Sequence, residues 1–170
     1  MKTTLYTGKF LALVKEGRWE YAERVRATGA AIIVAVTGGG KLLLVEQYRI
    51  PIGRRTIELP AGIVGDTGDE ESGAEAARRE LLEETGYHAD KMELLMVGPS
   101  SSGLTSELAT LYLASGLRKV HAGGGVEHEE IIVHEAPLNE AHDWLEAKVK
   151  AGLMIEPKVY AGLYFLHRKI

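Results

Sequence analysis

The stretch SGAEAARRELLEETGY (residues 72–87) decides the fold of this chain, because almost every residue of it marks a part of one helix. Ser72 followed by Glu75 matches the S-x-x-E capping box, which places the start of a helix at Ser72. Alanines and leucines then supply good helix formers and an apolar face. Gly86 is typical of the residue just beyond the last helical turn. The spacing therefore predicts a helix over residues 73–85.

Three glutamates crowd the last turns of this helix. Glu80 and Glu84 lie one above the other, and Glu83 lies beside them. Like charges four residues apart destabilise a helix by roughly 0.2–0.5 kcal/mol. Two interpretations follow: either the glutamates form a solvated face that pairs with Arg78 and Arg79, or a cation lies in front of them.

Two glycine-rich acidic loops favour the cation. One, GDTGDEES (65–72), precedes the helix, and the other, HAGGGVEHEE (121–130), lies far downstream. Hard divalent cations take their ligands from carboxylates, backbone carbonyls and water, and Mg²⁺ in particular combines a few carboxylates with substrate phosphates. The helix and the loops together therefore indicate a metal site.

Length and composition exclude several classes of protein. The chain has 170 residues with 45% hydrophobic and 26% charged residues, which predicts one globular domain over residues 1–170. Its net charge of -4 argues against a nucleic-acid partner. With no cysteine, disulfides and thiolate chemistry are excluded. The apolar run FLALV near the start is too short for a signal or membrane segment, so we expect a cytoplasmic protein without a membrane partner.

Outward from the helix, the pattern alternates between strands and helices. Two apolar runs at 30–36 and 41–50 flank the glycine turn TGGG and predict a β-hairpin. The other expected strands lie within 8–26 and at 56–64, 91–97, 108–114 and 131–136, and two further helices are expected at 138–153 and 158–170. This order predicts one α+β domain.

The residues from Gly65 to Tyr87 fit the pattern G-x5-E-x7-R-E-L-L-E-E-T-G-Y, which resembles the Nudix box of hydrolases acting on nucleoside diphosphates linked to another moiety. QYRIPIGRRTIELPAG (47–62) and AGGGVEHEEIIVHE (122–135) extend the resemblance to the ADP-ribose and ADP-sugar pyrophosphatase branch and to the related GDP-mannose hydrolases. The resemblance implies a Nudix-type α/β/α sandwich with a mixed sheet. It also implies a small N-terminal β region (1–26) that contacts a second subunit of a homodimer.

The chain departs from this branch at two places. The box glycine of the family is usually that of PAG, here Gly62, whereas the strict spacing is met from Gly65, and both assignments stay open. The SPG motif of ADP-ribose enzymes reads Ser101-Ser102-Gly103 here, without its proline. This second departure and the AGGGVE loop favour the GDP-mannose type as the alternative.

By resemblance, Glu80 and Glu84 are the main metal ligands, Glu83 adds to the cluster, and the Ala61 carbonyl supplies a backbone ligand. The implied cofactor is Mg²⁺, with Mn²⁺ as a possible substitute. Arg79 is expected to orient the glutamates rather than to touch the substrate.

The resemblance also implies a catalytic base in the loop at 121–130. Glu127 is expected to be the base and Glu129 a further metal contact, although the two roles can be exchanged. His128 between them is expected to be neither base nor ligand.

For the substrate, Trp19 is either a stacking platform for the nucleotide base or a core residue. Glu20 is expected to accept from an exocyclic amine, and Arg49 to bind phosphate or base, since a guanidinium binds phosphate with two hydrogen bonds. Glu58 and Glu107 are either substrate contacts or partners in surface ion pairs.

The activity implied is Mg²⁺-dependent hydrolysis of ADP-ribose or a related nucleoside diphosphate sugar to a nucleoside monophosphate and a sugar phosphate. An alternative of another class is a Nudix domain that binds a nucleotide as a regulator without cleaving it. Such domains typically lose box glutamates, and Glu80, Glu83 and Glu84 are all present here.

Overall fold

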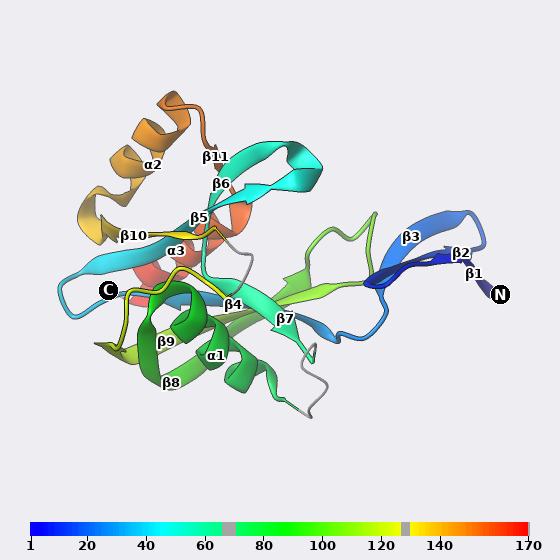
Figure 1. Cartoon of the computed structure of the whole chain (residues 1–170), viewed down its shortest axis with the longest axis horizontal. Coiled ribbons are helices and arrows are strands. Elements are labelled where there is room, and N and C mark those ends of the chain that lie inside the picture. The colour runs from blue at the N-terminus through cyan, green and yellow to red at the C-terminus, as the bar shows by residue number, and fades with distance from the viewer. Residues whose placement is uncertain (66–70, 127–129, 170) are drawn as a thin grey trace.

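The computed structural model describes residues 1–65, 71–126 and 130–169, and it builds two four-stranded mixed sheets with helices outside them (Figure 1). The first sheet has the order β7-β4-β9-β8 and the second β10-β5-β6-β11, and a separate three-stranded antiparallel sheet has the order β1-β2-β3. The α+β class and the Nudix-type sandwich expected from the sequence are confirmed.

The strands are β1 (Lys2–Thr7), β2 (Leu11–Glu16), β3 (Trp19–Arg24), β4 (Gly29–Ala35), β5 (Lys41–Arg49), β6 (Arg54–Glu58), β7 (Ala61–Val64), β8 (Tyr87–Pro99), β9 (Leu108–Lys119), β10 (Ile132–Pro137) and β11 (Met154–Ile155). The helices are α1 (Gly73–Thr85), α2 (Ala141–Lys150) and α3 (Pro157–Lys169), with short 3-10 turns at Ile50–Ile52 and Leu138–Glu140.

The hairpin predicted for residues 30–50 is wrong. β4 and β5 meet only at one isolated bridge, Val36 with Leu42, and then enter different sheets. Each is a central strand, buried along most of its length. A continuous apolar run is typical of a strand covered on both faces, whereas a two-stranded hairpin with a solvated face alternates. Both runs therefore lie at the centre of separate sheets.

The strand predicted over residues 56–64 is also two strands. β6 ends at Glu58 and belongs to the second sheet, and β7 begins at Ala61 and belongs to the first. Pro60 lies at the change, where its fixed φ and missing N–H end regular pairing. This crossing brings the Ala61–Gly62 backbone to the edge of the first sheet.

Alternating side chains of β4 reach two cores. Ala31, Ile33 and Ala35 pack with the apolar face of α1, while Ile32 and Val34 pack with residues of β5, α2 and α3. Figure 1 shows α1 on one side of the sheets and α2 and α3 on the other. The Glu84 side chain of α1 is also buried, where it meets the backbone of Ala61 in β7.

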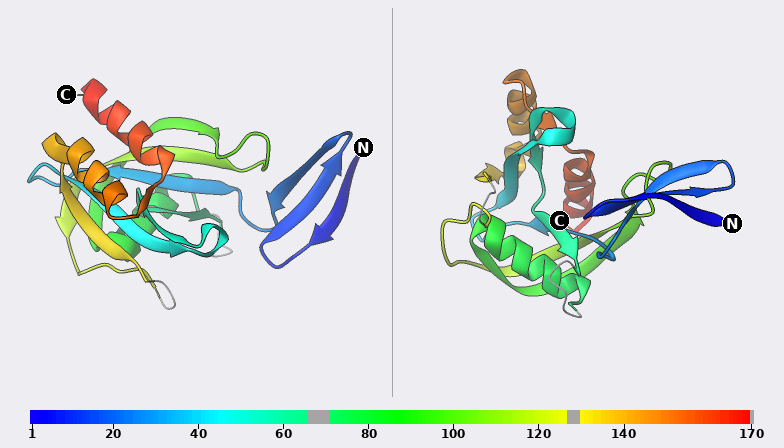
Figure 2. Two further views of the ribbon diagram at one scale, coloured as in Figure 1. Left: turned by 90° about the horizontal axis from the view of Figure 1, so that it is seen from above. Right: turned by 45° about the vertical axis from the view of Figure 1, so that its right-hand side comes forward.

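The sheet β1–β3 projects from this body (Figure 2). Backbone hydrogen bonds from Ala22 N–H to the Leu104 carbonyl (2.8 Å) and from Ser106 N–H to the Ala22 carbonyl (3.1 Å) tie it to the loop before β9. Among the described residues, no helix is long and apolar enough to cross a membrane.

Candidate active site

The helix α1 begins and ends as its sequence predicts. Ser72 accepts from the Glu75 N–H through its hydroxyl, while the Glu75 carboxylate accepts from the Ser72 N–H at 2.8 Å. The Ser72 hydroxyl also donates to the Glu75 carboxylate at 2.6 Å, and this bond, together with that from the Ser72 N–H, lowers the pKa of the Glu75 carboxyl. Gly86 closes the helix in the left-handed conformation with φ 75°. Local signals therefore fix where the glutamates of the last turns lie.

Arg79 joins three carboxylates of this region. It donates to Glu71 through two nitrogens (3.0 and 3.1 Å), to Glu80 (2.8 Å) and to Glu83 (3.2 Å). Pairing with Glu71 above all, and then with Glu80, raises the pKa of the Arg79 guanidinium. The like-charge repulsion between Glu80 and Glu83 is thus offset by the positive charge of Arg79.

Glu84 is buried, with 4% of its surface exposed, and it accepts from the Ala61 N–H at 3.0 Å. The Ile33 N–H donates to the Pro60 carbonyl at 2.8 Å, so residue 60 faces β4. Because backbone groups of successive strand residues point to opposite edges, the N–H and C=O of Ala61 both lie at the other edge, towards α1. The Ala61 carbonyl therefore shares one edge with the carboxylates.

Gly62 and Gly65 have different roles in the structure. A Cβ at residue 62 would overlap the Glu80 carboxyl group, so only glycine lets this backbone and this glutamate meet. Gly65 has φ 84° and its nearest neighbours lie 3.9 Å from an added Cβ, so it serves the turn after β7. The glycine beside the carboxylates is that of the PAG motif, Gly62.

A cleft of about 230 Å³ opens beside Ala61 and Gly62. Its charged lining residues are Arg24, Arg49, Glu58, Glu107 and Lys158. Each of its three cationic side chains pairs with a glutamate: Arg24 with Glu107, Arg49 with Glu58 and Lys158 with Glu156. Arginine and lysine side chains in such a cleft can bind phosphate oxygens.

Arg49 and Glu58 form a two-bond ion pair inside this cleft (2.8 and 2.6 Å). Burial raises the pKa of the Glu58 carboxyl, but the hydrogen bonds from Arg49 and Thr56 outweigh it and the net pKa is lowered. The same pair raises the pKa of Arg49. Both residues line the cleft. They are therefore partners in an ion pair and also in a position to contact a substrate.

Glu107 pairs with Arg24 of β3 and lines the same cleft. Arg24 and Lys158 were not predicted as site residues, because neither belongs to a recognisable motif and only the tertiary fold brings them here. Glu71 was also missed as a site residue, although its fixed place in the G-x5-E-x7-R-E pattern was the available signal.

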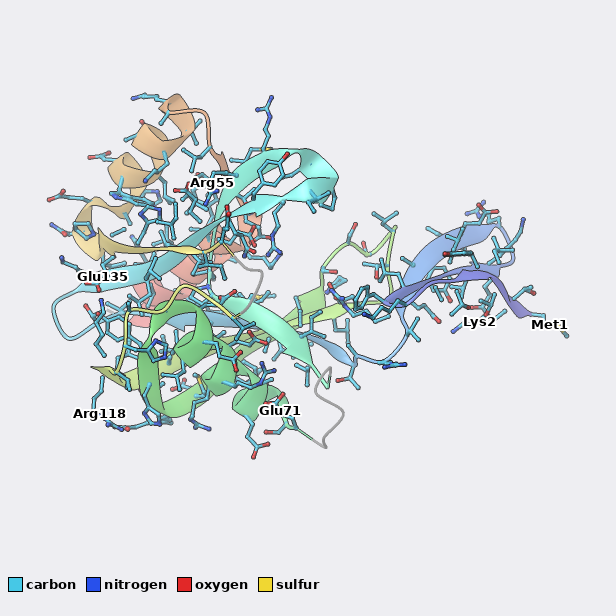
Figure 3. The ribbon with its side chains drawn as sticks, viewed as in Figure 1. Met1, Lys2, Arg55, Glu71, Arg118 and Glu135 are labelled. Carbon is cyan, nitrogen blue, oxygen red and sulfur yellow. The ribbon has the colours of Figure 1, made fainter. Side chains whose placement is uncertain are left out.

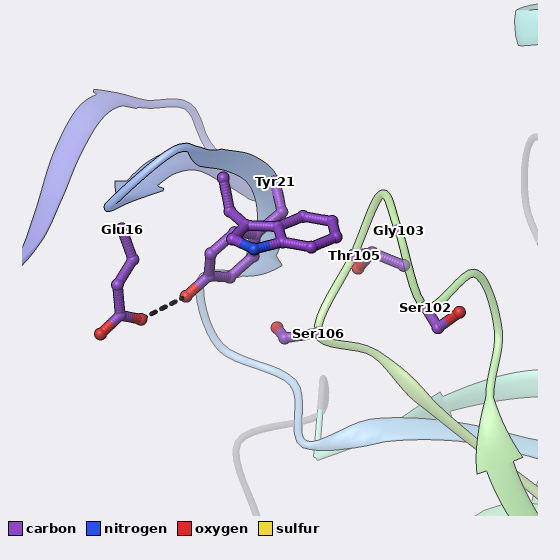
Figure 4. A pocket seen from close by; sticks show the side chains of 7 residues that line it. Glu16, Tyr21, Ser102, Gly103, Thr105 and Ser106 are labelled. Carbon is purple, nitrogen blue, oxygen red and sulfur yellow. Dashed lines mark hydrogen bonds between the residues drawn. The ribbon is translucent and has the colours of Figure 1, made fainter.

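Trp19 is not a core residue, because 54% of its surface is exposed on β3. It lines a second cleft, of about 410 Å³, together with Tyr21 and the loop containing Ser102 and Ser106 (Figure 4). Tyr21 donates to Glu16 there at 3.4 Å. Glu20 points to the other face of the strand and pairs with Lys15 at 3.3 Å. The two clefts share no lining residue, and none of the α1 glutamates lines the cleft that contains Trp19.

Glu127, His128 and Glu129 lie outside the described residues. Within the part of the chain that is described, no three His, Asp or Glu side chains converge as a metal-binding group. The donor types nevertheless fit a hard cation. Glu84 accepts from the Ala61 N–H, the Glu80 carboxyl lies against Gly62, and Arg79 joins Glu80 to Glu83.

A partly buried network of charged and polar side chains lies on the second sheet. Glu46 of β5 accepts from Arg55 of β6 (2.7 Å) and contacts His134 of β10 (2.9 Å). Arg55, labelled in Figure 3, also donates to the Glu130 carbonyl at 3.4 Å. The network therefore joins three strands to the residue that precedes β10 by two positions.

Comparison with known proteins gives one family. The NUDIX domain model matches residues 26–152. The chain is 36% identical to the methanol dehydrogenase activator of Bacillus methanolicus over 78% of its length and 70% of that protein. It is 32% identical to the ADP-ribose pyrophosphatase of Bacillus subtilis (86% and 82% covered) and 32% identical to a GDP-mannose pyrophosphatase of Yersinia pestis (82% and 73% covered).

A solved structure described as an ADP compounds hydrolase has the same fold, with a TM-score of 0.76, 22% identity and coverage of 99% of this chain and 90% of that one. The box helix, the cleft beside it and these matches lead to the same result. This chain belongs to the NUDIX domain family.

Proposed function

We propose that this protein is a Mg²⁺-dependent pyrophosphohydrolase that cleaves the diphosphate of ADP-ribose or a related nucleoside diphosphate sugar. The products are a nucleoside monophosphate and a sugar phosphate. The observation that carries the proposal is the edge at which Glu80, Glu84 and the Ala61 backbone meet, next to a cleft lined by Arg24, Arg49 and Lys158.

Glu80, Glu83, Glu84 and the Ala61 carbonyl would hold the metal, with Mn²⁺ as a substitute. When bound, a divalent cation polarises phosphoryl oxygens and lowers the pKa of bound water. Arg79 keeps the carboxylates in place through its bonds to Glu71, Glu80 and Glu83. Removing an orienting partner of this kind typically costs about 10- to 100-fold in metal affinity or activity.

Arg49 binds a phosphate oxygen of the substrate from the cleft wall, with its guanidinium held in place by Glu58. Glu127 takes a proton from the attacking water, and Glu129 adds a carboxylate to the metal site; the exchange of these two roles stays an alternative. The water oxygen bonds to one phosphorus while the bond from that phosphorus to the bridging oxygen breaks. The bridging oxygen leaves with the second phosphate, so two phosphate monoesters result.

A homodimer completes the site in this proposal, and we place it in the cytoplasm. Within one chain, Trp19 lines a different cleft from the one beside the α1 carboxylates. A second subunit would bring its Trp19 close to these carboxylates. The projecting sheet β1–β3 exposes large apolar side chains that a partner would cover, namely Leu5, Tyr6, Phe10, Leu11 and Leu13. Glu20 and Glu107 contact the nucleotide in the complete site.

GDP-mannose hydrolysis is the second candidate function. Ser102 stands where the ADP-ribose enzymes carry proline, and a GDP-mannose pyrophosphatase is among the relatives. A non-hydrolytic regulatory domain is the alternative of another class.

A substrate panel tests these candidates. The purified protein is incubated with Mg²⁺ and ADP-ribose, ADP-glucose, GDP-mannose, NADH or a dinucleoside polyphosphate, and monoester products are measured by coupled phosphate release. We expect turnover of ADP-ribose or a nucleotide sugar. Binding of a nucleotide without turnover of any compound would favour the regulatory domain instead.

A further inference from the structure

The segment from Val120 to Gly125 runs along the C-terminal end of α1. Gly124 N–H donates to the Glu84 carbonyl at 2.8 Å, and Gly125 N–H donates to the Glu83 carbonyl at 3.1 Å. The Val120 N–H also donates to the Gly86 carbonyl at 2.7 Å. The backbone carbonyls of two proposed metal ligands are therefore held by glycines some forty residues downstream.

Such bonds matter because the last four carbonyls of a helix have no partner within the helix. In α1 the Gly86 N–H satisfies the Leu82 carbonyl at 2.8 Å, and the next two carbonyls depend on Gly124 and Gly125. Without them the last turn would rely on water and would fray more readily. Glu83 and Glu84 both lie in that turn.

Only glycine allows this approach of the two backbones. Gly123, Gly124 and Gly125 have φ values of 76°, 114° and 83°. A Cβ at Gly123 would lie 2.5 Å from the Thr85 carbonyl carbon and 2.6 Å from the Glu84 carbonyl oxygen. These atoms belong to the helix backbone, which cannot rotate away as a flexible side chain can.

We propose that Gly123–Gly125 form a backbone clamp that positions Glu83 and Glu84 for metal binding. These glycines are positioning residues, since they touch the helix backbone and not the reacting atoms. The inference rests on the proposed function and adds a requirement to it: the clamp holds the backbone of Glu83 and Glu84, while Arg79 holds the Glu83 carboxylate. The clamp also fixes the chain two residues before Glu127, the proposed base.

Gly123→Ala is the variant that tests the clamp, and the chain offers matched controls. Gly152 has a left-handed φ of 91° with open space around it, so Gly152→Ala reproduces the backbone strain without the overlap. Gly38 has open space and no such φ, so Gly38→Ala controls for the substitution itself.

Two readouts are independent of turnover. Amide hydrogen exchange by NMR should show slow exchange of Gly124 and Gly125 in the native protein and in both controls, and fast exchange in Gly123→Ala. Titration with Mn²⁺ alone should show affinity weakened about 10- to 100-fold in Gly123→Ala, as for loss of a ligand-orienting contact, and unchanged in the controls. The half-saturating Mg²⁺ concentration for turnover should rise by a similar factor.

Fast exchange of Gly124 and Gly125 in the native protein would overturn the clamp. Unchanged Mn²⁺ affinity in a folded Gly123→Ala variant would overturn it as well. If Gly123→Ala does not fold, Gly124→Ala replaces it: an added Cβ there meets nothing closer than 3.9 Å, while a φ of 114° disfavours the backbone conformation in which the Gly124 N–H reaches the Glu84 carbonyl. Absence of turnover in the native protein would sink the proposed function alone, since exchange and Mn²⁺ binding still test the clamp.

Discussion

The Glu80 carboxyl group of α1 lies directly against Gly62 of β7, in the space that a side chain at residue 62 would fill. In Gly62→Ala the new methyl group must displace the Glu80 carboxyl, which is the far end of a flexible side chain. We expect turnover to fall about 10- to 100-fold while the free energy of unfolding changes by no more than about 1 kcal/mol.

Steady-state kinetics and urea unfolding measure both quantities. Gly38→Ala, in open space, is the matched control and should leave both unchanged. Full activity of Gly62→Ala would remove Glu80 from the site.

Glu84 is the second residue whose substitution should affect turnover. Its carboxylate is buried and accepts from the Ala61 N–H, and glutamine keeps its shape and its acceptor oxygen. Glu84→Gln should therefore fold normally, with turnover reduced by at least about 100-fold, since a direct ligand should matter more than its orienting partners.

The control is Glu146→Gln, which changes an exposed glutamate on α2. Circular dichroism and kinetics at several Mg²⁺ concentrations give the comparison. Equal turnover in the two variants would exclude Glu84 from the mechanism.

At the scale of elements, the Glu46 network couples the stability of strands β5, β6 and β10 to pH. Burial raises the pKa of the Glu46 carboxyl, but the hydrogen bonds from His134 and Arg55 lower it overall. A carboxyl with a lowered pKa in the folded state stabilises the protein above its unfolded pKa of about 4.3. That contribution is lost as the pH falls through the folded pKa.

The difference in unfolding free energy between the native protein and Glu46→Gln should accordingly be largest above about pH 5 and shrink towards pH 3. Urea unfolding across this range measures it, with the exposed Glu146→Gln as control. A difference that stays constant or grows on acidification would contradict the role of Glu46.

The elements also show which parts of the fold can be predicted. The bounds of α1 follow from Ser72, Glu75 and Gly86, because caps act within one turn. The partners of β4 and β5 could not be predicted in the same way, because packing of the whole core determines which strands pair. A glycine turn can join strands of two different sheets, as it does here. The unbroken apolar character of both runs was the signal for central strands.

In the candidate site, too, local sequence patterns predict some residues and not others. Glu80, Glu83, Glu84 and Arg79 follow from helical spacing together with a resemblance to a known motif. Arg24 and Lys158 enter the cleft from the two ends of the chain, so no local pattern marks them. The exposure of Trp19 likewise depends on a sheet that projects from the body.

At the scale of the whole molecule, the projecting sheet predicts a dimer. Its exposed apolar side chains include Tyr6 and Phe10, 68% and 67% exposed. Multi-angle light scattering should give twice the chain mass of 18.5 kDa. Phe10→Asp should shift the mass towards that of one chain, because it would bury a charge in the interface.

The matched control is Met154→Asp, which changes an exposed apolar residue far from this sheet. A native mass of one chain would contradict the dimer. Trp19 would then not belong to the same substrate site as the α1 carboxylates.

In the proposed function, the carboxylates of α1 serve metal-dependent hydrolysis of a diphosphate. Phosphorus NMR of the protein with ADP-ribose or GDP-mannose and Mg²⁺ follows this reaction at the phosphorus atoms themselves. We expect the two diphosphate signals of one of these compounds to disappear, two phosphate monoester signals to replace them, and chelation of the metal to stop the change. Diphosphate signals that persist for both compounds, or monoesters that form equally fast after chelation, would contradict it.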